Sequence, residues 1–512
     1  MRADRIVVIG AGVGGLVAAL DLAARGLEVL VIERAAGPGG KMREVEVDGA
    51  RLDAGPTVFT MRWVFEELFG DVGASLADHL TLRPASVLAR HAWGERERLD
   101  LFADLDRSAD AIGSFAGPAE ARRFREFSER AARIYRTLER PFIRAARPTP
   151  QSLVFGAGVR GLGDLWRISP FDTLWRALGQ HFHDPRLRQL FGRYATYCGS
   201  SPFVAPATLM LVAHVEQDGV WLVDGGMHRV AIALAGLAGV RGARFRYGAE
   251  AAEIEVSGGQ AAAVRLATGE RIDARAVIVN ADAAAVASGL LGRAAARGVA
   301  SIATAARSLS AMTWALVAET EGFPLARHTV FFSGDYAAEF EDILRRGRLP
   351  AAPTVYVCAQ DRDDRGAGAH GAERLLCLVN APASGDAHPF DESEIRTCEE
   401  RTFALLARCG LRLRRMPGRS VLTTPADFDR LFPGTGGALY GQASHGWTAS
   451  FTRPGARTRI PGLYLAGGST HPGPGVPMAA LSGRAAASSL AADLASISRS
   501  RTAAMHGGTS TH

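Results

Sequence analysis

A glycine-rich turn between two short apolar strands limits the fold of this chain more than any other feature. Residues 5–9 (R-I-V-V-I) form a β-branched run without polar alternation, which predicts a buried parallel strand. The turn G-A-G-V-G-G follows, then an alanine-rich helix over residues 16–25 and a second apolar strand over residues 28–32. This order predicts the α/β class with a parallel sheet.

The glycines of the turn have the spacing of a dinucleotide site. Gly10 permits a tight turn, Gly12 lets the backbone approach a pyrophosphate, and Gly15 lets the helix pack on the strand, with Gly14 between them. The positive end of the helix favours the diphosphate. Glu33 ends the second strand, where a carboxylate would accept hydrogen bonds from a ribose diol and disfavour a 2′-phosphate. The alternative is an incidental glycine loop.

A second run, residues 156–161 (G-A-G-V-R-G), has the same spacing but lacks the flanking strand and the alanine-rich helix. We interpret it as a flexible loop. Without a second dinucleotide site, a bound nicotinamide reductant is not expected.

The residues after Glu33 favour FAD over NAD. A glycine loop over residues 34–42 leads into a hairpin with an Asp-Gly turn, over residues 44–53, and then into Gly55, Pro56 and Thr57. This succession resembles the superfamily of FAD-containing amine oxidases and phytoene desaturases, which begins with a glutathione-reductase-like Rossmann FAD domain. Further matches are a β-meander over residues 253–274, the strand 276–279 and the stretch 462–477, which precedes a helix from Met478.

The resemblance assigns the cofactor site. It implies that residues 33–41 contact the ribose and ribityl groups, that residues 55–57 pass near the isoalloxazine, and that Ala251 supplies backbone hydrogen bonds to the adenine. A helix N-terminus at residues 476–478 would stabilise negative charge at flavin N1 and the C2 carbonyl. The predicted FAD-binding residues are Gly10, Gly12, Gly14, Gly15, Glu33, Arg34, Gly40, Lys41, Met42, Gly55, Pro56, Thr57, Ala251, Asp282, Gly467, Gly468, Val476, Pro477 and Met478.

One departure narrows the subgroup. Amine oxidases of the superfamily usually carry an acid after the glycine of the last strand, and some a cysteine nearby, whereas this chain has Gly468 and no nearby cysteine. The run 467–477 (G-G-S-T-H-P-G-P-G-V-P) instead resembles carotenoid desaturases. Two further stretches, 197–203 and 219–227, are most similar to the bacterial 1-hydroxycarotenoid 3,4-desaturase branch, also called methoxyneurosporene dehydrogenase.

The resemblance implies a discontinuous domain organisation. Residues 1–75, 224–295 and 456–495 would form the FAD-binding domain, and residues 76–117, 201–223 and 296–455 a mixed-sheet substrate domain. Residues 118–200 would form a helical insertion, and residues 496–512 a disordered tail, since the tail lacks apolar periodicity.

The charge is concentrated in the insertion. Residues 118–200 hold 15 Arg and 7 Asp or Glu in a chain whose formal net charge is +6. Between these arginines, apolar residues recur near helical spacing: Phe124, Phe127, Ile134, Tyr135, Leu138 and Phe142. A basic helix with an aromatic face suits an anionic membrane interface, and the alternative is a surface helix packed on the sheet. We favour membrane contact because the expected substrate dissolves in lipid.

The implied reaction removes a hydride and a proton from adjacent carbons of a carotenoid, forming the C3–C4 double bond. The delocalised polyene lowers the need for a strong base, so we assign no catalytic residue. The protein must supply a dry tunnel that holds the chain against the flavin. His214 and Glu216 fall on one face of a predicted strand, 209–216, and are candidates to bind a tertiary hydroxyl.

Several other classes are disfavoured. The run 181–184 (H-F-H-D) is interpreted as a solvated pair of histidines on a charged helix, so no metal is expected. Residues 468–471 lack the G-x-S-x-G elbow of hydrolases, and no nucleic-acid motif accompanies the arginines. The apolar run 6–20 is too short to span a bilayer, and five cysteines without metal spacing favour a reducing cytoplasm.

We therefore expect a cytoplasmic enzyme at the periphery of the inner membrane, with FAD, a hydrophobic carotenoid substrate and an unidentified electron acceptor, oxygen or quinone. The rival predictions are another flavin-dependent carotenoid desaturase, including phytoene desaturase, an isomerase, an amine oxidase, and a non-catalytic flavoprotein that binds lipid.

Overall fold

A five-stranded parallel sheet forms one part of the molecule. The computed structural model describes residues 4–149, 151, 171–363, 371–446 and 448–506. The strand order of the sheet is β20 (Leu463–Leu465), β13 (Ala276–Val279), β1 (Ile6–Ile9), β2 (Val29–Ile32) and β9 (Arg244–Arg246). All four pairings are parallel, which the β-branched runs without alternation predicted.

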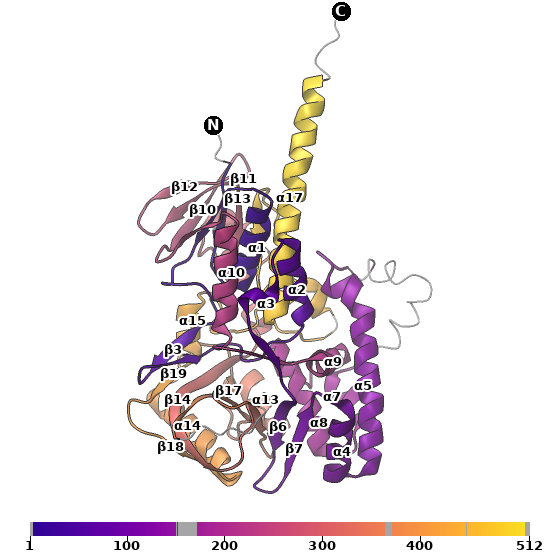
Figure 1. Ribbon diagram of the computed structural model, residues 1–512. Coiled ribbons are helices and arrows are strands. Elements are labelled where there is room, and N and C mark those ends of the chain that lie inside the picture. Colours follow the sequence, from indigo (N-terminus) through magenta and orange to yellow (C-terminus); the bar gives the residue numbers. More distant parts are fainter. Residues whose placement is uncertain (1–3, 150, 152–170, 364–370, 447, 507–512) are drawn as a thin grey trace, which may run out of the picture.

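Different elements pack on the two faces of this sheet. Ile6 and Val8 of β1 pack with three helices, α1 (Val13–Ala24), α10 (His228–Val240) and α17 (Val476–His506). Val7 and Ile9 point to the other face, where they pack against a meander. The meander consists of β10 (Ala251–Ser257), β11 (Gln260–Leu266) and β12 (Arg271–Asp273), and lies beside α1 and α10 in Figure 1.

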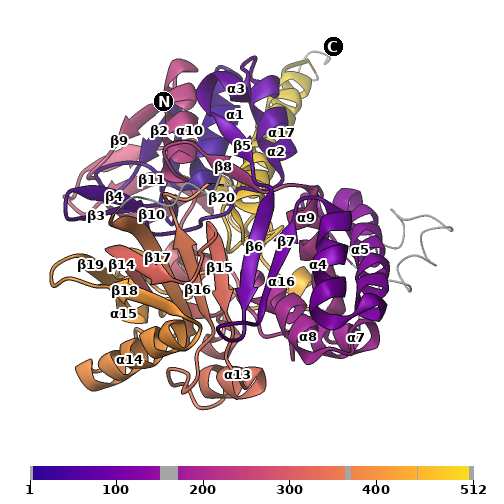
Figure 2. The same cartoon turned by 60° about the horizontal axis from the view of Figure 1, so that its bottom comes forward.

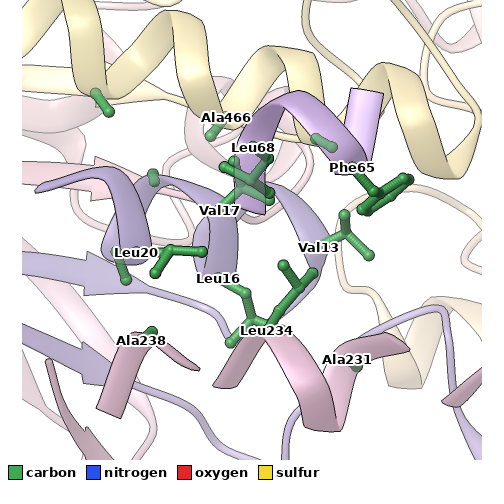
Figure 3. Close-up of a cluster of buried hydrophobic side chains, with 14 of the residues drawn as sticks. Val13, Leu16, Val17, Leu20, Phe65, Leu68, Ala231, Leu234, Ala238 and Ala466 are labelled. Carbon is green, nitrogen blue, oxygen red and sulfur yellow. The ribbon is translucent and has the colours of Figure 1, made fainter. Parts of the chain in front are cut away.

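Close packing around α1 fixes where the glycine turn ends. Figure 3 shows Leu16, Val17 and Leu20 of α1 beside Leu68 and Leu234. Leu68 belongs to α2 (Arg62–Asp71) and Leu234 to α10. Because α1 is buried along nearly its whole length, its N-terminus has one position above the ends of the strands.

A mixed sheet forms the second part, as the sequence predicted. Its strands run β18 (Leu411–Arg414), β14 (Ser310–Gly322), β17 (Glu373–Ala381), β16 (Val355–Ala359), β15 (His328–Phe331), β6 (Val87–Ala92) and β7 (Arg98–Phe102), and β19 (Ser420–Thr423) also pairs with β14. β15 and β6 pair in parallel, and the other neighbours are antiparallel.

Helices from the predicted insertion lie beside β6 and β7, as Figure 2 shows. They are α5 (Pro118–Leu138), α7 (Leu174–His181) and α8 (Pro185–Gly192). Two helices of the predicted substrate domain, α4 (Leu105–Ala116) and α9 (Leu211–Asp218), lie with them. The remaining elements are β3 (Glu44–Val47), β4 (Ala50–Asp53), α3 (Leu76–His79), β5 (Leu82–Pro84), η1 (Glu139–Ile143), η2 (Arg193–Cys198), η3 (Ala207–Met210), β8 (Trp221–Val223), α11 (Ala283–Ala287), α12 (Arg293–Ala296), η4 (Thr304–Ala306), α13 (Tyr336–Leu344), α14 (Glu392–Arg408), α15 (Pro425–Leu431) and α16 (Ala449–Thr452).

The aromatic face of α5 differs from its prediction. Phe124, Phe127, Ile134 and Leu138 are buried in a core that also contains Leu99 and Leu101 of β7. Tyr135 is buried in the core of the parallel sheet. The face that we expected at a membrane therefore packs on the protein, because the same helical spacing serves either purpose.

Two further sequence predictions differ from the structure. Residues 209–216 are not a strand: they pass from η3 into the helix α9. Helix α17 continues to His506 and projects beyond the rest of the molecule in Figure 1, although disorder was predicted from residue 496. The second glycine run, 156–161, lies outside the described residues. Within the described ranges, no helix is both long and apolar enough to cross a bilayer.

Candidate functional site

A cavity of about 910 Å³ extends from the carboxyl ends of the parallel strands to the face of the mixed sheet. Segments from three distant parts of the chain line it: the turn after β1, the residues after β13 and the residues after β20. Of the predicted cofactor residues, those that line this cavity are Gly10, Gly12, Gly14, Glu33, Arg34, Gly40, Lys41, Met42, Gly55, Pro56, Thr57, Ala251, Asp282, Gly467, Gly468, Val476, Pro477 and Met478. Gly15 alone among them is absent from the lining.

The glycine turn leaves no room for side chains. A Cβ at Gly12 would lie 2.7 Å from Asn280 Oδ1, and one at Gly14 would lie 2.7 Å from the backbone N of Gly467. Gly10 has φ +97°, in the region that favours glycine. A Cβ at Gly15 would lie 2.1 Å from Gly10 O, which agrees with its predicted role in packing the helix on the strand.

Glu33 is held at the end of β2 by two backbone amides. Its Oε2 accepts a hydrogen bond of 2.7 Å from Ala11 N–H, and its Oε1 accepts one of 2.8 Å from Ala35 N–H. A carboxylate oxygen can accept more than one hydrogen bond. The held carboxylate therefore keeps capacity for a diol in the cavity.

Two buried polar oxygens of the lining have no partner among the described residues. Asn280 donates from Nδ2 to Ala466 O at 3.1 Å, while its Oδ1 is unpaired. Asp282 caps α11 by accepting a hydrogen bond from Ala284 N–H, while its Oδ2 is unpaired. Unpaired buried acceptors are costly, so they indicate a ligand that donates hydrogen bonds. The glycine cradle and these acceptors fit a dinucleotide.

Two cations line the same cavity: Lys41, which is half-buried, and Arg453, which is buried. Lys41, the only lysine of the chain, donates from Nζ to Leu439 O at 2.7 Å, and burial lowers its pKa. Arg453 donates to the carbonyls of Tyr440 and Gln442, and burial likewise lowers its pKa. Both cations are paired here with neutral carbonyls. Together with the N-terminus of α17, Lys41 and Arg453 place positive charge along the cavity. Positive charge suits a flavin ring, which becomes electron-rich when it is reduced.

The rest of the lining is largely apolar. It comes from the end of α5, from η1, η3, α9 and α16, and from the mixed sheet. It includes Leu138, Phe142, Leu209, Leu211, Val212, Val215, Val330, Leu376, Leu378 and Phe451. Such a surface suits a long apolar ligand. The cavity thus joins a polar, glycine-lined half to an apolar half.

The two predicted substrate residues lie in different places. Glu216 lines the cavity and is buried, where it accepts hydrogen bonds from the hydroxyls of Tyr194 and Tyr197. His214 is not part of the lining, and its ring contacts Tyr135 at 5.0 Å between centroids. Burial lowers the pKa of His214. The residues do not share a face, because the segment is helical and positions two apart diverge.

The predicted histidine pair is only half solvated. His183 is exposed, and its backbone N–H donates to Glu120. His181 stacks edge-on against Phe127 and lies 3.3 Å from Arg130, and burial lowers its pKa to about 4. Asp184 caps α8 instead of facing the histidines.

The sequence prediction missed Asn280, Arg193, Tyr356 and Arg453. Asn280 follows β13 in the same way that Glu33 follows β2, so its place at a strand end was the available signal. The other three reach the cavity from η2, the mixed sheet and the segment after α16. No local pattern marks them.

The fold and this cavity define a class of protein. The model of the family described as flavin containing amine oxidoreductase matches residues 13–491, so the chain belongs to that family, as the motifs predicted. Hydroxyneurosporene desaturase from Rubrivivax gelatinosus is 59% identical over 512 residues, covering 100% of this chain and 98% of its own length.

Two other comparisons agree with this assignment. Hydroxyneurosporene desaturase from Cereibacter sphaeroides is 46% identical, covering 97% of this chain and 99% of its own length. The crystal structure of an oxidoreductase from Methanosarcina mazei has a TM-score of 0.58 at 17% identity, covering 94% of this chain and 99% of its own. The predicted resemblance to carotenoid desaturases is confirmed, and the solved structure supports the fold alone.

Proposed function

We propose that this protein is an FAD-dependent carotenoid desaturase that introduces the C3–C4 double bond into 1-hydroxycarotenoids. The observation that carries the proposal is the single cavity whose glycine-lined half suits a dinucleotide and whose other half suits a polyene. Similarity to two hydroxyneurosporene desaturases along the whole chain supports the choice of substrate.

The cofactor half would hold FAD in the manner of a glutathione-reductase-like Rossmann domain. In this proposal the turn from Gly10 to Gly14 faces the pyrophosphate, Glu33 binds the ribose diol, and Ala251 binds the adenine. Residues 55–57 and the N-terminus of α17 would flank the isoalloxazine. The domains would follow the three-part division predicted from the sequence, with residues 118–200 added to the substrate domain.

Desaturation needs little covalent help from the protein. The bound flavin supplies a hydride acceptor, and the neighbouring carbon of the polyene loses a proton, so the substrate loses two hydrogens in all. The apolar walls of the cavity exclude water and restrict the polyene to a few orientations. Lys41 and Arg453 add positive charge where the ring would become electron-rich.

We also propose that the protein works at the cytoplasmic face of the inner membrane, because a carotenoid has to be taken from lipid. Phe171 supports this: its side chain is 64% exposed and it also belongs to the cavity lining. It stands in a segment with an excess of arginine. An exposed aromatic residue at the mouth of an apolar cavity suits a lipid surface.

The proposed function is tested by the pigments of a cell that accumulates a 1-hydroxycarotenoid. Expression of this chain should convert that pigment to a product lighter by two hydrogens, identified by mass and by its longer conjugated absorption. An isomerase would leave the mass unchanged, an amine oxidase would release peroxide, and a non-catalytic lipid-binding flavoprotein would leave the pigments as they were.

A further inference from the structure

A buried polar cluster interrupts the apolar half of the cavity. We define the cluster as Arg193, Tyr197 and Glu216. Arg193 Nη2 donates to Tyr197 Oη at 2.8 Å, and Tyr197 Oη donates to Glu216 Oε1 at 3.1 Å. Tyr194 Oη donates to Glu216 Oε2. Arg193, Tyr197 and Glu216 line the cavity, whereas Tyr194 does not.

The cluster has unused hydrogen-bonding capacity. Within the described part of the chain, Arg193 uses one of its five guanidinium N–H groups in a hydrogen bond. Each carboxylate oxygen of Glu216 accepts one hydrogen bond. Both side chains are buried, where an unpaired charge is expensive. A ligand group that donates to Glu216 and accepts from Arg193 would satisfy both residues. A hydroxyl does this with one atom.

The cluster and the segment assigned to the flavin ring line the same cavity. Thr57 Oγ1 is 2.7 Å from Tyr356 Oη, and Tyr356 Oη is 2.7 Å from His328 Nδ1. Burial raises the pKa of Tyr356, and the nearby Arg193 and Tyr197 also affect it. Tyr356 and Thr57 line the same cavity as Arg193, Tyr197 and Glu216.

The chemistry of the substrate requires its hydroxyl to bind near the flavin ring. In a 1-hydroxycarotenoid the oxygen is bonded to C1, and the reacting carbons are C3 and C4. With bonds of about 1.5 Å, the oxygen lies within about 5 Å of C4 however the chain is rotated. A residue that binds the hydroxyl must therefore lie beside the flavin ring. The cluster lines the same cavity as residues 55–57, which the proposal places at the ring, whereas His214 is outside the lining.

We propose that Glu216 and Arg193, held by Tyr197, bind the tertiary hydroxyl of the substrate and so determine selectivity for hydroxylated carotenoids. The inference rests on the proposed desaturase function and adds the residues that recognise the hydroxyl of the substrate. Glu216 accepts the hydroxyl hydrogen, and Arg193 donates to the hydroxyl oxygen. Tyr197 is a positioning residue, because it bridges the two.

The test uses two matched substrates, a 1-hydroxy-1,2-dihydrocarotenoid and the same polyene with hydrogen in place of the hydroxyl. The measured quantity is the ratio of their kcat/KM values on one protein preparation, which cancels losses of flavin or folded protein. For wild type we expect a preference of about 10- to 100-fold for the hydroxylated substrate. In Glu216→Gln and Tyr197→Phe that preference should fall by about tenfold, with less change on the deoxy substrate.

Tyr194→Phe is the matched control. It removes a hydroxyl that donates to the same carboxylate, but from outside the cavity. The preference should stay near that of wild type. If Tyr197→Phe and Glu216→Gln keep the full preference, or if Tyr194→Phe loses as much as they do, the proposed recognition is wrong. If wild type converts neither substrate, the desaturase proposal itself fails, whatever the variants do.

Discussion

The carboxylate of Glu33, at the end of β2, accepts a hydrogen bond of 2.7 Å from the backbone N–H of Ala11, in the glycine turn after β1. This bond joins two loops that the sequence assigns to neighbouring parts of one dinucleotide. It holds the carboxylate before any ligand arrives. Preorganisation of this kind lowers the cost of binding.

Replacing Glu33 should therefore weaken the retention of FAD. Glu33→Ala removes the acceptor for the ribose diol, and hydrogen bonds to a charged group contribute about 1.5–3 kcal/mol each. We expect the ratio of flavin to protein absorbance to fall after gel filtration at low concentration. Glu28→Ala is the control, because Glu28 precedes β2 and pairs with Arg5 on the surface. Full flavin occupancy in Glu33→Ala would contradict the assignment.

The close approach of Gly12 to Asn280 gives a second prediction. In Gly12→Ala the new Cβ would lie 2.7 Å from Asn280 Oδ1 and would fill the phosphate cradle. Overpacking costs about 1–3 kcal/mol, so FAD affinity should fall by roughly tenfold or more in a titration of apoprotein. Gly37→Ala provides the comparison, since a Cβ there meets nothing within 4 Å. Equal affinity in both variants would exclude close contact at Gly12.

The buried His328 predicts a dependence of stability on pH. Burial, with smaller contributions from Arg327 and Arg193, lowers its pKa to about 3, so the folded state keeps it neutral. The unfolded state takes up a proton below about pH 6.5, and the folded state does not. Stability should consequently fall as the pH decreases from about 7 toward 3.

The contribution of His328 to the pH dependence of stability can be isolated with the variant His328→Gln. Between pH 7 and pH 5 the histidine accounts for a loss of about 2 kcal/mol in the free energy of unfolding. The variant is expected to be less stable at pH 7, because Tyr356 loses a partner, but its slope against pH should be shallower by that amount. His388→Gln, at an exposed site, should keep the wild-type slope in denaturant unfolding. A wild-type slope in His328→Gln would mean that the group is not neutral in the folded protein.

Substitution of Phe171 tests the proposed contact with a membrane. Flotation with anionic vesicles should recover wild type, and Phe171→Ser should bind roughly tenfold or more weakly, since inserting a phenylalanine contributes about 1.5–3 kcal/mol. Val240→Ser changes a residue that is 78% exposed at the end of α10, and it should bind like wild type. Vesicle binding unaffected by Phe171→Ser would place the membrane surface elsewhere.

The sequence predicted the parts of this molecule whose chemistry is local. The turn from Gly10 to Gly15, the carboxylate of Glu33 and the parallel strands each have a pattern within a short stretch, and the structure places them around one cavity. Residues 209–216 were predicted wrongly as a strand. A short apolar run fits a buried helix as well as a strand, and only its tertiary contacts decide.

The cluster around Glu216 could not be predicted in the same way. Arg193 and Tyr197 come from η2 and Glu216 from α9, and only the assembled fold brings them to one cavity. The aromatic face of α5 illustrates the same limit. Helical spacing showed that Phe124 and Phe127 share one face, but it did not show whether lipid or protein covers that face.

Anaerobic mixing of the purified, FAD-loaded protein with a 1-hydroxycarotenoid tests the central claim most directly. The claim predicts that the visible absorption band of the flavin bleaches, and that the recovered carotenoid is lighter by two hydrogens, in equal amounts. A preparation that binds no FAD, or one whose flavin keeps its full absorption while the carotenoid is bound, would contradict it.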